Sequence, residues 1–222
     1  TVTNKGTISS GAFQNGCSVT NNGTITRGTF QNGCSVTNNS TGKITGGTFQ
    51  SGCSVKNYGT IKDNGTFEGT VENSGTIENG TFNEKVINGK MISNGIFKGT
   101  VTNGFIGTIS GGTFAAGLSG NDGAVTGGVF NGNAYITGVT GLHSITLNAF
   151  QSTDKIAEVN GVLADWKPYA YKGTPVTITA DTEIFSLNGQ PIAESSYGVD
   201  KKTVTFTMPD DDVVLNGELI TK

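Results

Sequence analysis

Charge is scarce in this chain. Only 14% of its 222 residues are charged, and the formal net charge is −3. Proteins that bind nucleic acid need a clustered basic face, so this composition argues against a nucleic-acid partner. Long apolar runs are also missing, and no run approaches the ~18 residues that a membrane-spanning helix needs. We therefore expect no membrane insertion by this segment.

Histidine occurs once and cysteine three times. His143 has no serine or cysteine nucleophile motif around it, and Asp154 and Glu158 have no defined geometry relative to it. No catalytic triad follows from such a set, so we interpret His143 as a solvated side chain. We expect no enzyme activity, no catalytic residue, no cofactor and no bound metal.

Glycine, in contrast, makes up 35 residues, about twice its usual share of ~7%. It recurs in a pattern of Gly-Thr-Ile, Gly-Thr-Phe and Val-x-Asn that returns about eight times. The pattern forms three apolar ladders: Phe13, Phe30, Phe49, Phe67, Phe82, Phe97, Phe114 and Phe130; Ile8, Ile25, Ile44, Ile61, Ile77, Ile92, Ile109 and Val125; and Val19, Val36, Val55, Val71, Val86, Val101 and Leu118. A fixed period of 15–19 residues predicts a repeat architecture, in which each unit buries its apolar side chains against the next.

The repeat units are predicted to be strands. Each ladder residue stands between small polar residues, which is the two-residue alternation of a β-strand. Glycine and asparagine allow the positive φ values of sharp corners, whereas a helix would not tolerate them at this density. Three strands and three corners per repeat predict an all-β fold, a single-stranded parallel β-helix of triangular cross-section. With ~4.8 Å per turn, eight turns give a rod of ~40 Å.

Asparagine forms a fourth ladder at one corner, where stacked side-chain amides are expected to hydrogen-bond along the rod. Its members are Asn21, Asn38, Asn57, Asn73, Asn88 and Asn103. The spacing from ladder Phe to ladder Val is six residues up to Val55 and four from Phe67 onward, so the rod is predicted to narrow there. Residues 1–4 already resemble the end of a turn and no signal peptide is visible, so we expect a mature or trimmed fragment.

The pattern changes toward the C-terminus. Residues 138–164 break the repeat and are predicted to close the solenoid, whose last turn would otherwise expose unpaired strand edges. From residue 165 to 222 glycine becomes rarer, and longer alternating runs appear at 175–179, 202–208 and 213–219. We therefore predict two domains, a solenoid of residues 1–164 and a small antiparallel β module of residues 165–222.

The module carries a resemblance to a known family. Residues 173–180 read Gly-Thr-Pro-Val-Thr-Ile-Thr-Ala, and residues 205–213 read Thr-Phe-Thr-Met-Pro-Asp-Asp-Asp-Val. These segments resemble the modules of large bacterial surface proteins related to the internalin-type B repeats, although the usual central tryptophan is absent. In its pattern, the solenoid resembles the right-handed β-helix stalks of secreted bacterial adhesins. Together these resemblances imply an adhesin-like protein of the cell surface, with the module as a spacer or tether.

Cys17, Cys34 and Cys53 each stand two residues before a ladder valine, so they share its inward face. We interpret them as a buried stack of thiols that pack as small hydrophobic side chains. Neighbouring Cα atoms ~4.8 Å apart would also permit one disulfide. Zinc is not expected, because the outer two cysteines would lie ~9.6 Å apart, whereas two sulfurs on one zinc lie within ~4.6 Å.

Carboxylates gather in the fourth and fifth turns, at Asp63, Glu68, Glu72, Glu78 and Glu84. β-Helix enzymes that cut polysaccharides use such groups, but a glycosidase needs two carboxyls that face one cleft. We interpret these residues as a solvated face, in which Glu78 forms an ion pair with Lys62 of the preceding turn. The run 210–212 of three aspartates is interpreted as a turn before the last strand rather than as a calcium site.

Outward threonines form two rows, one before the ladder Ile and one before the ladder Phe. With one aromatic side chain they supply the candidate ligand-binding residues, which are Thr24, Thr29, Thr48, Thr66, Thr81 and Tyr58. Phe105 and Tyr135 are further aromatic candidates. Threonine arrays also occur in ice-binding solenoids, but those use Thr-x-Thr, which beside the ladder Ile only residues 24–26 obey. Lys43, Met91 and Ile96 interrupt the rows.

These observations favour a non-catalytic structural or adhesive rod. The alternatives are a polysaccharide-active lyase or hydrolase and an ice- or surface-binding solenoid. Weak, repeated polar contacts suit an extended partner, such as a host or matrix glycan or glycoprotein. We expect a monomer that is located outside the cell or on its surface. The identity of the ligand and the mode of anchoring stay open.

Overall fold

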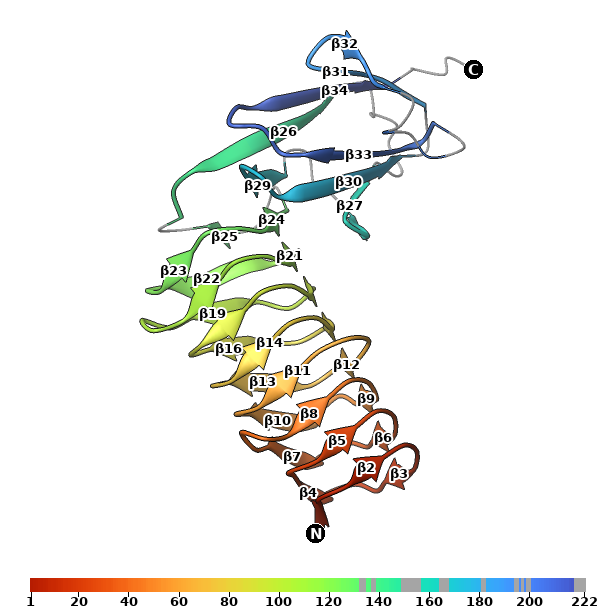
Figure 1. Cartoon of the computed structure of the whole chain (residues 1–222), viewed down its shortest axis with the longest axis vertical. Helices are drawn as coiled ribbons and strands as arrows, with labels where there is room; N and C mark the ends of the chain where they lie inside the picture. The colour runs from red at the N-terminus through yellow and green to blue at the C-terminus, as the bar shows by residue number, and fades with distance from the viewer. Residues whose placement is uncertain are drawn as a thin grey trace.

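The computed structural model describes residues 1–131, 135–136, 139–148, 157–163, 168–180, 183–193, 196, 198 and 201–217. Within these ranges the chain is an all-β rod of stacked turns with a smaller group of strands at its C-terminal end (Figure 1). None of the described segments is a helix long and apolar enough to cross a membrane. The fold class predicted from the repeat is therefore confirmed.

Each turn of the rod contributes one strand to each of three parallel sheets, which we name after their ladder residues. In the described residues the Val sheet contains β1 (Val2–Asn4), β4 (Ser18–Asn21), β7 (Ser35–Asn38), β10 (Ser54–Asn57), β13 (Thr70–Asn73), β16 (Val86–Asn88), β19 (Val101–Asn103), β22 (Gly117–Asn121) and β25 (Tyr135–Ile136). The Ile sheet contains β2 (Thr7–Ile8), β5 (Thr24–Ile25), β8 (Lys43–Ile44), β11 (Thr60–Ile61), β14 (Thr76–Ile77), β17 (Met91–Ile92), β20 (Thr108–Ile109) and β23 (Ala124–Val125). The Phe sheet begins with β3 (Ala12–Phe13), β6 (Thr29–Phe30), β9 (Thr48–Phe49), β12 (Thr66–Phe67), β15 (Thr81–Phe82), β18 (Ile96–Phe97), β21 (Thr113–Phe114) and β24 (Val129–Phe130).

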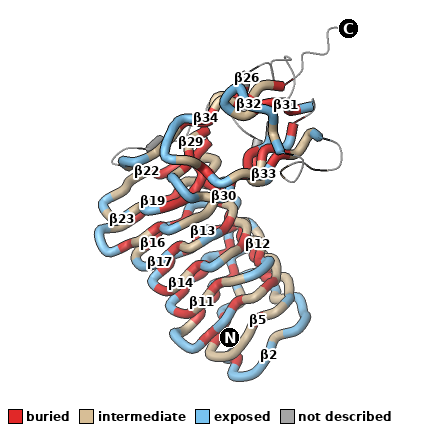
Figure 2. Tube along the Cα trace, turned by 45° about the horizontal axis from the view of Figure 1, so that its top comes forward, coloured by how far each residue is buried: buried red, intermediate tan, exposed pale blue. Residues whose placement is uncertain are grey.

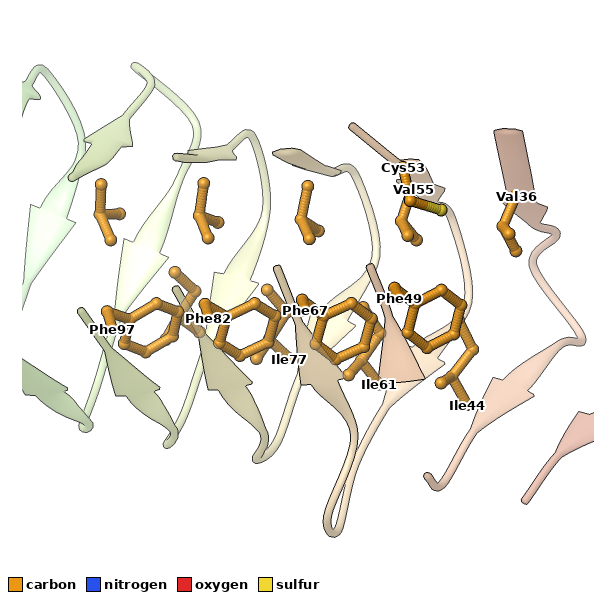
Figure 3. Packing of buried hydrophobic residues seen from close by; sticks show 14 of the residues in the cluster. Val36, Ile44, Phe49, Cys53, Val55, Ile61, Phe67, Ile77, Phe82 and Phe97 are labelled. Atoms are coloured by element: carbon orange, nitrogen blue, oxygen red, sulfur yellow. The ribbon is translucent and has the colours of Figure 1, made fainter. Parts of the chain in front are cut away.

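Identical residues stack in register through the rod. Phe67 lies opposite Phe49 and Phe82 in the Phe sheet, and its ring centroid is 4.6 Å and 4.8 Å from theirs. The ring of Phe67 is fully buried, as predicted, and the ladder Val and Ile side chains pack around the stack (Figure 3). Burial alternates with exposure along the turns because inward ladder residues alternate with outward polar ones (Figure 2).

The asparagine ladder is also confirmed, and it extends from Asn4 to Asn121. Asn73 illustrates the arrangement. Its Oδ1 accepts a hydrogen bond from Asn57 Nδ2 at 2.7 Å, and its own Nδ2 donates to Asn88 Oδ1 at 2.8 Å and to the carbonyl of Gly75 at 3.2 Å. Because the side chain is buried, these bonds offset the cost of removing the amide from water.

The connection from the Phe sheet to the Val sheet shortens where the sequence predicts. In the third turn it includes Gly52 at φ 77° and a hydrogen bond from Cys53 N to Gln50 O. In the fourth turn only Glu68 and Gly69 remain, and Thr70 pairs directly with Ser54. A Cβ at position 69 would overlap the carbonyl oxygen of Cys53, so the short connection requires glycine there.

Beyond the last turn, the Phe sheet continues into the C-terminal strands. β24 pairs antiparallel with β29 (Tyr169–Tyr171), and the sheet goes on through β26 (Leu142–Asn148), β34 (Val213–Gly217), β31 (Ile184–Leu187) and β32 (Gln190–Pro191). A second sheet contains β28 (Val162–Leu163), β27 (Ala157–Val159), β30 (Pro175–Ala180) and β33 (Thr203–Thr207). We call these strands the module. Its described pairs are antiparallel except for β26 with β34, which are parallel.

The strand pairing differs from the expected boundary at residue 165. β26 and β27 precede that residue, yet they pair with β34 and β30, and Ile145 and Val159 lie in the module's core. The backbone groups of β26 and β27 therefore form their hydrogen bonds within the module rather than with the rod. The architecture therefore changes near residue 138. Independent folding of the solenoid stays a prediction.

Candidate functional site

The corner between the Ile sheet and the Phe sheet carries the grooves of the rod. In most turns this connection begins with a serine or threonine, and it ends in glycine, as in Ser93-Asn94-Gly95. Gly95 has φ 134°, a backbone conformation that L side chains rarely adopt, and a Cβ on it would be in tight contact with the Phe97 ring at 3.1 Å. No side chain therefore projects outward from the backbone at this glycine, and this leaves space for a ligand at the corner.

The first hydroxyls of this corner donate to backbone carbonyls of the preceding turn. Ser93 Oγ donates to the carbonyl of Ile77 at 3.3 Å, and Thr26 Oγ1 donates to that of Ile8 at 3.2 Å. Each oxygen thus keeps its lone pairs for an outside donor. The amides of Asn79 and Asn94 have no side-chain hydrogen bond to another described residue, so they offer both donors and acceptors.

The larger groove, which we call the upper groove, has a volume of about 840 Å³ and lies between this corner and the module. Its rod wall comes from residues 93–96, 110–113 and 126–127 with Asn79, and its module wall comes from residues 160–161 and 172–175 with Thr177. The turn between β27 and β28 extends from the module toward the rod (Figure 1). The groove exists because the module overhangs the last turns.

Several bonds fix the module wall. Asn160 donates to the carbonyl of Pro175 at 3.2 Å and accepts from the amide of Thr177 at 2.7 Å. Tyr171 donates from its hydroxyl to the carbonyl of Val125 on the rod at 2.9 Å. Burial raises the pKa of Tyr171, so the hydroxyl keeps the proton that it donates. The two walls are thereby held at a defined separation.

A second groove of about 370 Å³, the lower groove, lies on the same corner nearer the N-terminus. Its walls include Arg27, Asn64 and three of the candidate threonines, Thr29, Thr48 and Thr66. These threonines lie in register in the Phe sheet. Their hydroxyls thus repeat at the strand spacing along the groove.

The remaining candidates lie elsewhere. Thr81 continues the same threonine row one turn above the lower groove and lies in neither groove lining. Thr24 belongs to the Ile sheet, and Tyr58 projects from the asparagine corner with an exposed fraction of 49%. Phe105 is exposed, and the side chain of Tyr135 lies outside the described residues. The candidates therefore do not form one site.

Sequence reasoning missed Asn94, Ser110 and Lys172 of the upper groove. The repeated Ser-x-Gly before the ladder Phe marks the rod wall in the sequence, but it does not mark a groove. The opposite wall depends on β27 and β30 pairing across 19 to 23 residues, and no local pattern indicates this pairing.

The electrostatics of the two grooves are simple. Lys172 and Arg27 are the ionisable side chains in their described linings, which contain no carboxylate. Lys172 Nζ lies 2.7 Å from Asp210 Oδ2, and His143 Nε2 lies 3.3 Å from Oδ1. The hydrogen bond from Lys172, followed by that from His143, lowers the pKa of Asp210. The described linings therefore lack the carboxyl pair that glycoside hydrolysis needs.

Several sequence interpretations change in detail. His143 is mostly buried and faces Asp210 rather than solvent alone, because β26 pairs with the strand that follows the aspartate run. Lys62 forms its described ion pair with Asp63, at 4.0 Å, and Glu78 is in none of the described ion pairs. Lys56 pairs with Glu72 at 3.5 Å across adjacent strands.

The aspartate run 210–212 precedes β34, as expected for a turn. Asp212 Oδ1 accepts a hydrogen bond from the amide of Ser144 at 2.6 Å, and Asp211 Oδ1 accepts one from the amide of Asp212 at 2.8 Å. These carboxylates stabilise backbone groups of the module. That role needs no metal ion.

The three thiols are free. Cys34 and Cys53 are buried, as predicted, and Cys17 is partly buried because it belongs to the first turn. Burial, with the neighbouring Cys34, raises the pKa of Cys53 to about 12, so it remains a thiol. The described residues contain no group of three or more metal-ligating side chains.

Comparison of the chain with known protein families, curated proteins and solved structures finds no match in any of the three.

Proposed function

We propose that this protein is a non-catalytic rod that binds an extended, neutral polar ligand, a glycan chain, along the corner between its Ile and Phe sheets. The observation that carries the proposal is the lining of the upper groove. Hydroxyls, amides and backbone groups surround about 840 Å³, with one lysine and no carboxylate in the described lining. Such groups match the hydroxyls of a sugar chain, which both donate and accept hydrogen bonds.

The geometry of the corner supports an extended ligand rather than a small one. The upper and lower grooves lie on the same corner, and the threonine row of the Phe sheet runs between them. A chain that follows this corner would make many weak contacts in sequence, and their effects would multiply. We further propose, from the resemblance of the module and of the repeat pattern, an adhesive role at the bacterial cell surface.

The test is a binding panel on the full chain. Soluble neutral and acidic polysaccharides are titrated by calorimetry, first with the unaltered protein. Asn94→Ala and Thr174→Ala remove one hydrogen-bonding side chain from each wall and should each weaken the binding of a neutral glycan about fivefold. Asn83→Ala, an exposed asparagine outside both grooves, is the matched control and should bind normally.

Two results would contradict the proposal. Absence of binding across the panel would remove the glycan as ligand. Release of new sugar ends during incubation with any polysaccharide of the panel would show that the rod is an enzyme.

A further inference from the structure

Two turns of the asparagine corner, where the Val sheet passes to the Ile sheet, are longer than the other described ones. Most connections here contain two residues, but residues 39–42 and 104–107 contain four. Both longer turns close in the same way, with Gly42 N donating to Asn39 O at 2.8 Å and Gly107 N donating to Gly104 O at 2.7 Å. The chain therefore contains the same turn twice.

The central residues of these twin turns differ in chemistry. One turn presents Ser40 and Thr41, whereas the other presents Phe105 and Ile106, two residues that are 85% and 78% exposed. The backbone of the turn evidently accepts serine and threonine, so the fold does not require the apolar pair. Apolar side chains with this exposure on an otherwise polar rod indicate a contact with a partner.

The apolar surface extends to the turn below. Ile87 and Met91 are 39% and 38% exposed and lie in register with Thr102 and Thr108, which flank the Phe105–Ile106 turn. At the same positions one turn further toward the N-terminus, the chain carries Glu72 and Thr76. Ile87, Met91, Phe105 and Ile106 are thus the exposed apolar residues around this turn, and we call them together the corner patch.

Charges of opposite sign lie on the two sides of the corner patch along the rod. Lys90 is at the corner one turn below Phe105, and Asp122 is at the corner one turn above. Both are exposed, and neither forms an ion pair with another described residue. Ring spacings of 4.8 and 4.9 Å in these turns place the two residues roughly two strand spacings apart, with the Phe105–Ile106 turn between them.

We propose that the corner patch binds the same patch on a second copy of this chain, with the two rods antiparallel. A two-fold axis through the Phe105–Ile106 turn would bring the apolar pairs together and place Lys90 of each copy opposite Asp122 of the other. Parallel rods would instead place Lys90 against Lys90 and Asp122 against Asp122. The order of charge, apolar pair and opposite charge is therefore self-complementary in the antiparallel arrangement alone.

The contact is weak. Four partly exposed side chains on one corner are a smaller surface than the roughly 800 Å² per partner of a stable interface. Association then depends on local concentration, which is high where many rods stand on one surface. The corner patch lies outside the described linings of both grooves, so the contact and the proposed glycan binding are separate. The proposed dimer differs from the monomer expected from the sequence, and the experiments below decide between the two.

The first test is sedimentation velocity of the full chain over a series of concentrations. The unaltered protein should show a reversible monomer–dimer equilibrium. Phe105→Ser with Ile106→Thr copies the twin turn, so the variant should keep its circular dichroism and Tm and remain a monomer. An unaltered protein that stays monomeric at its highest soluble concentration would overturn the proposal, as would dimers of the unchanged strength in the double variant.

The second test exchanges the charges. Lys90→Asp and Asp122→Lys should each weaken dimerisation about tenfold, because each places like charges opposite one another. The variant that carries both changes should recover the dimer. Failure of this recovery would overturn the antiparallel arrangement.

The matched control moves the apolar pair. Ser40→Phe with Thr41→Ile is added to the variant that carries Phe105→Ser and Ile106→Thr, so that the same turn is apolar but lacks Lys90 and Asp122 beside it. This protein should be monomeric. If it dimerises as the unaltered protein does, general apolar adhesion explains the association and the proposed contact is wrong.

Discussion

The rod and the module differ in how far apart in the sequence their partners lie. In the rod, the side chain of Asn73 donates a hydrogen bond to Asn88, and the ring of Phe67 stacks on that of Phe82. In both pairs the partners are 15 residues apart. In the module, the amide of Ser144 bonds to Asp212 across 68 residues. The rod is therefore a sum of contacts between neighbouring turns, whereas the module forms only when distant segments meet.

One strand belongs to both parts. Phe130 of β24 is in the rod's core, and the adjacent Val129 is in the module's core. β24 also pairs with β21 on one side and β29 on the other. Because the rod supplies an edge and a side chain to the module, we expect the dependence between the two parts to be one-sided.

The largest expected effect tests the rod. Phe67→Ala removes a fully buried ring between two others and should lower the free energy of unfolding by about 3–5 kcal/mol. The loss should be greatest in the turns of Phe49 and Phe82, because those rings lose a stacking partner. Urea denaturation gives the total, and amide hydrogen exchange gives its location. Uniform loss of protection across the module as well would show that the two parts are not separable.

A truncation tests the one-sided dependence. A fragment of residues 1–137 keeps the eight ladder phenylalanines and should retain the β-sheet circular dichroism of the rod. A fragment of residues 138–222 lacks Val129 and the β24 edge and should be unfolded. A fragment that ends at residue 164 is less informative, because it keeps β26 and β27 without β34 and β30. An unfolded 1–137 fragment would mean that the rod needs its cap.

The smallest expected effect lies in the module. The hydrogen bond from Lys172 lowers the pKa of Asp210 in the folded protein, so this pairing stabilises the fold at pH above the ordinary value of 3.8. The contribution is lost as the pH falls through the lowered pKa. Asp210→Asn should therefore reduce Tm slightly at neutral pH and leave it unchanged in strong acid. A Tm difference that persists in strong acid would mean that charge is not the cause.

The sequence predicts the rod well because its signal is repeated. Phe67, Val71 and Asn73 recur at one period, so each turn confirms the position of the next, and burial in register follows from the strand spacing. The module is predicted less well. The contacts of His143 with Asp210 and of β27 with β30 depend on distant pairing, which leaves no periodic pattern.

The candidate site residues divide in the same way, into those that the repeat predicts and those that depend on pairing between distant segments. Thr29, Thr48 and Thr66 belong to the repeat, so the sequence predicts them as a row, and the structure places them in the lining of the lower groove. Lys172 and Asn160 become groove residues only after the module folds over the rod. Phe105 is visible as an aromatic residue, but its significance depends on the twin turn at residues 39–42, a comparison that requires the backbone.

The asparagine ladder has a mechanical consequence. The strands run across the rod, so the bonds between turns point along its axis, and a pull between the first turn and the module loads them one turn at a time. Each turn that opens lengthens the chain by its own 15–19 residues and releases one buried amide bond together with its backbone bonds. A rod pulled at its two ends would thus open turn by turn, and the turns beyond the break would stay closed.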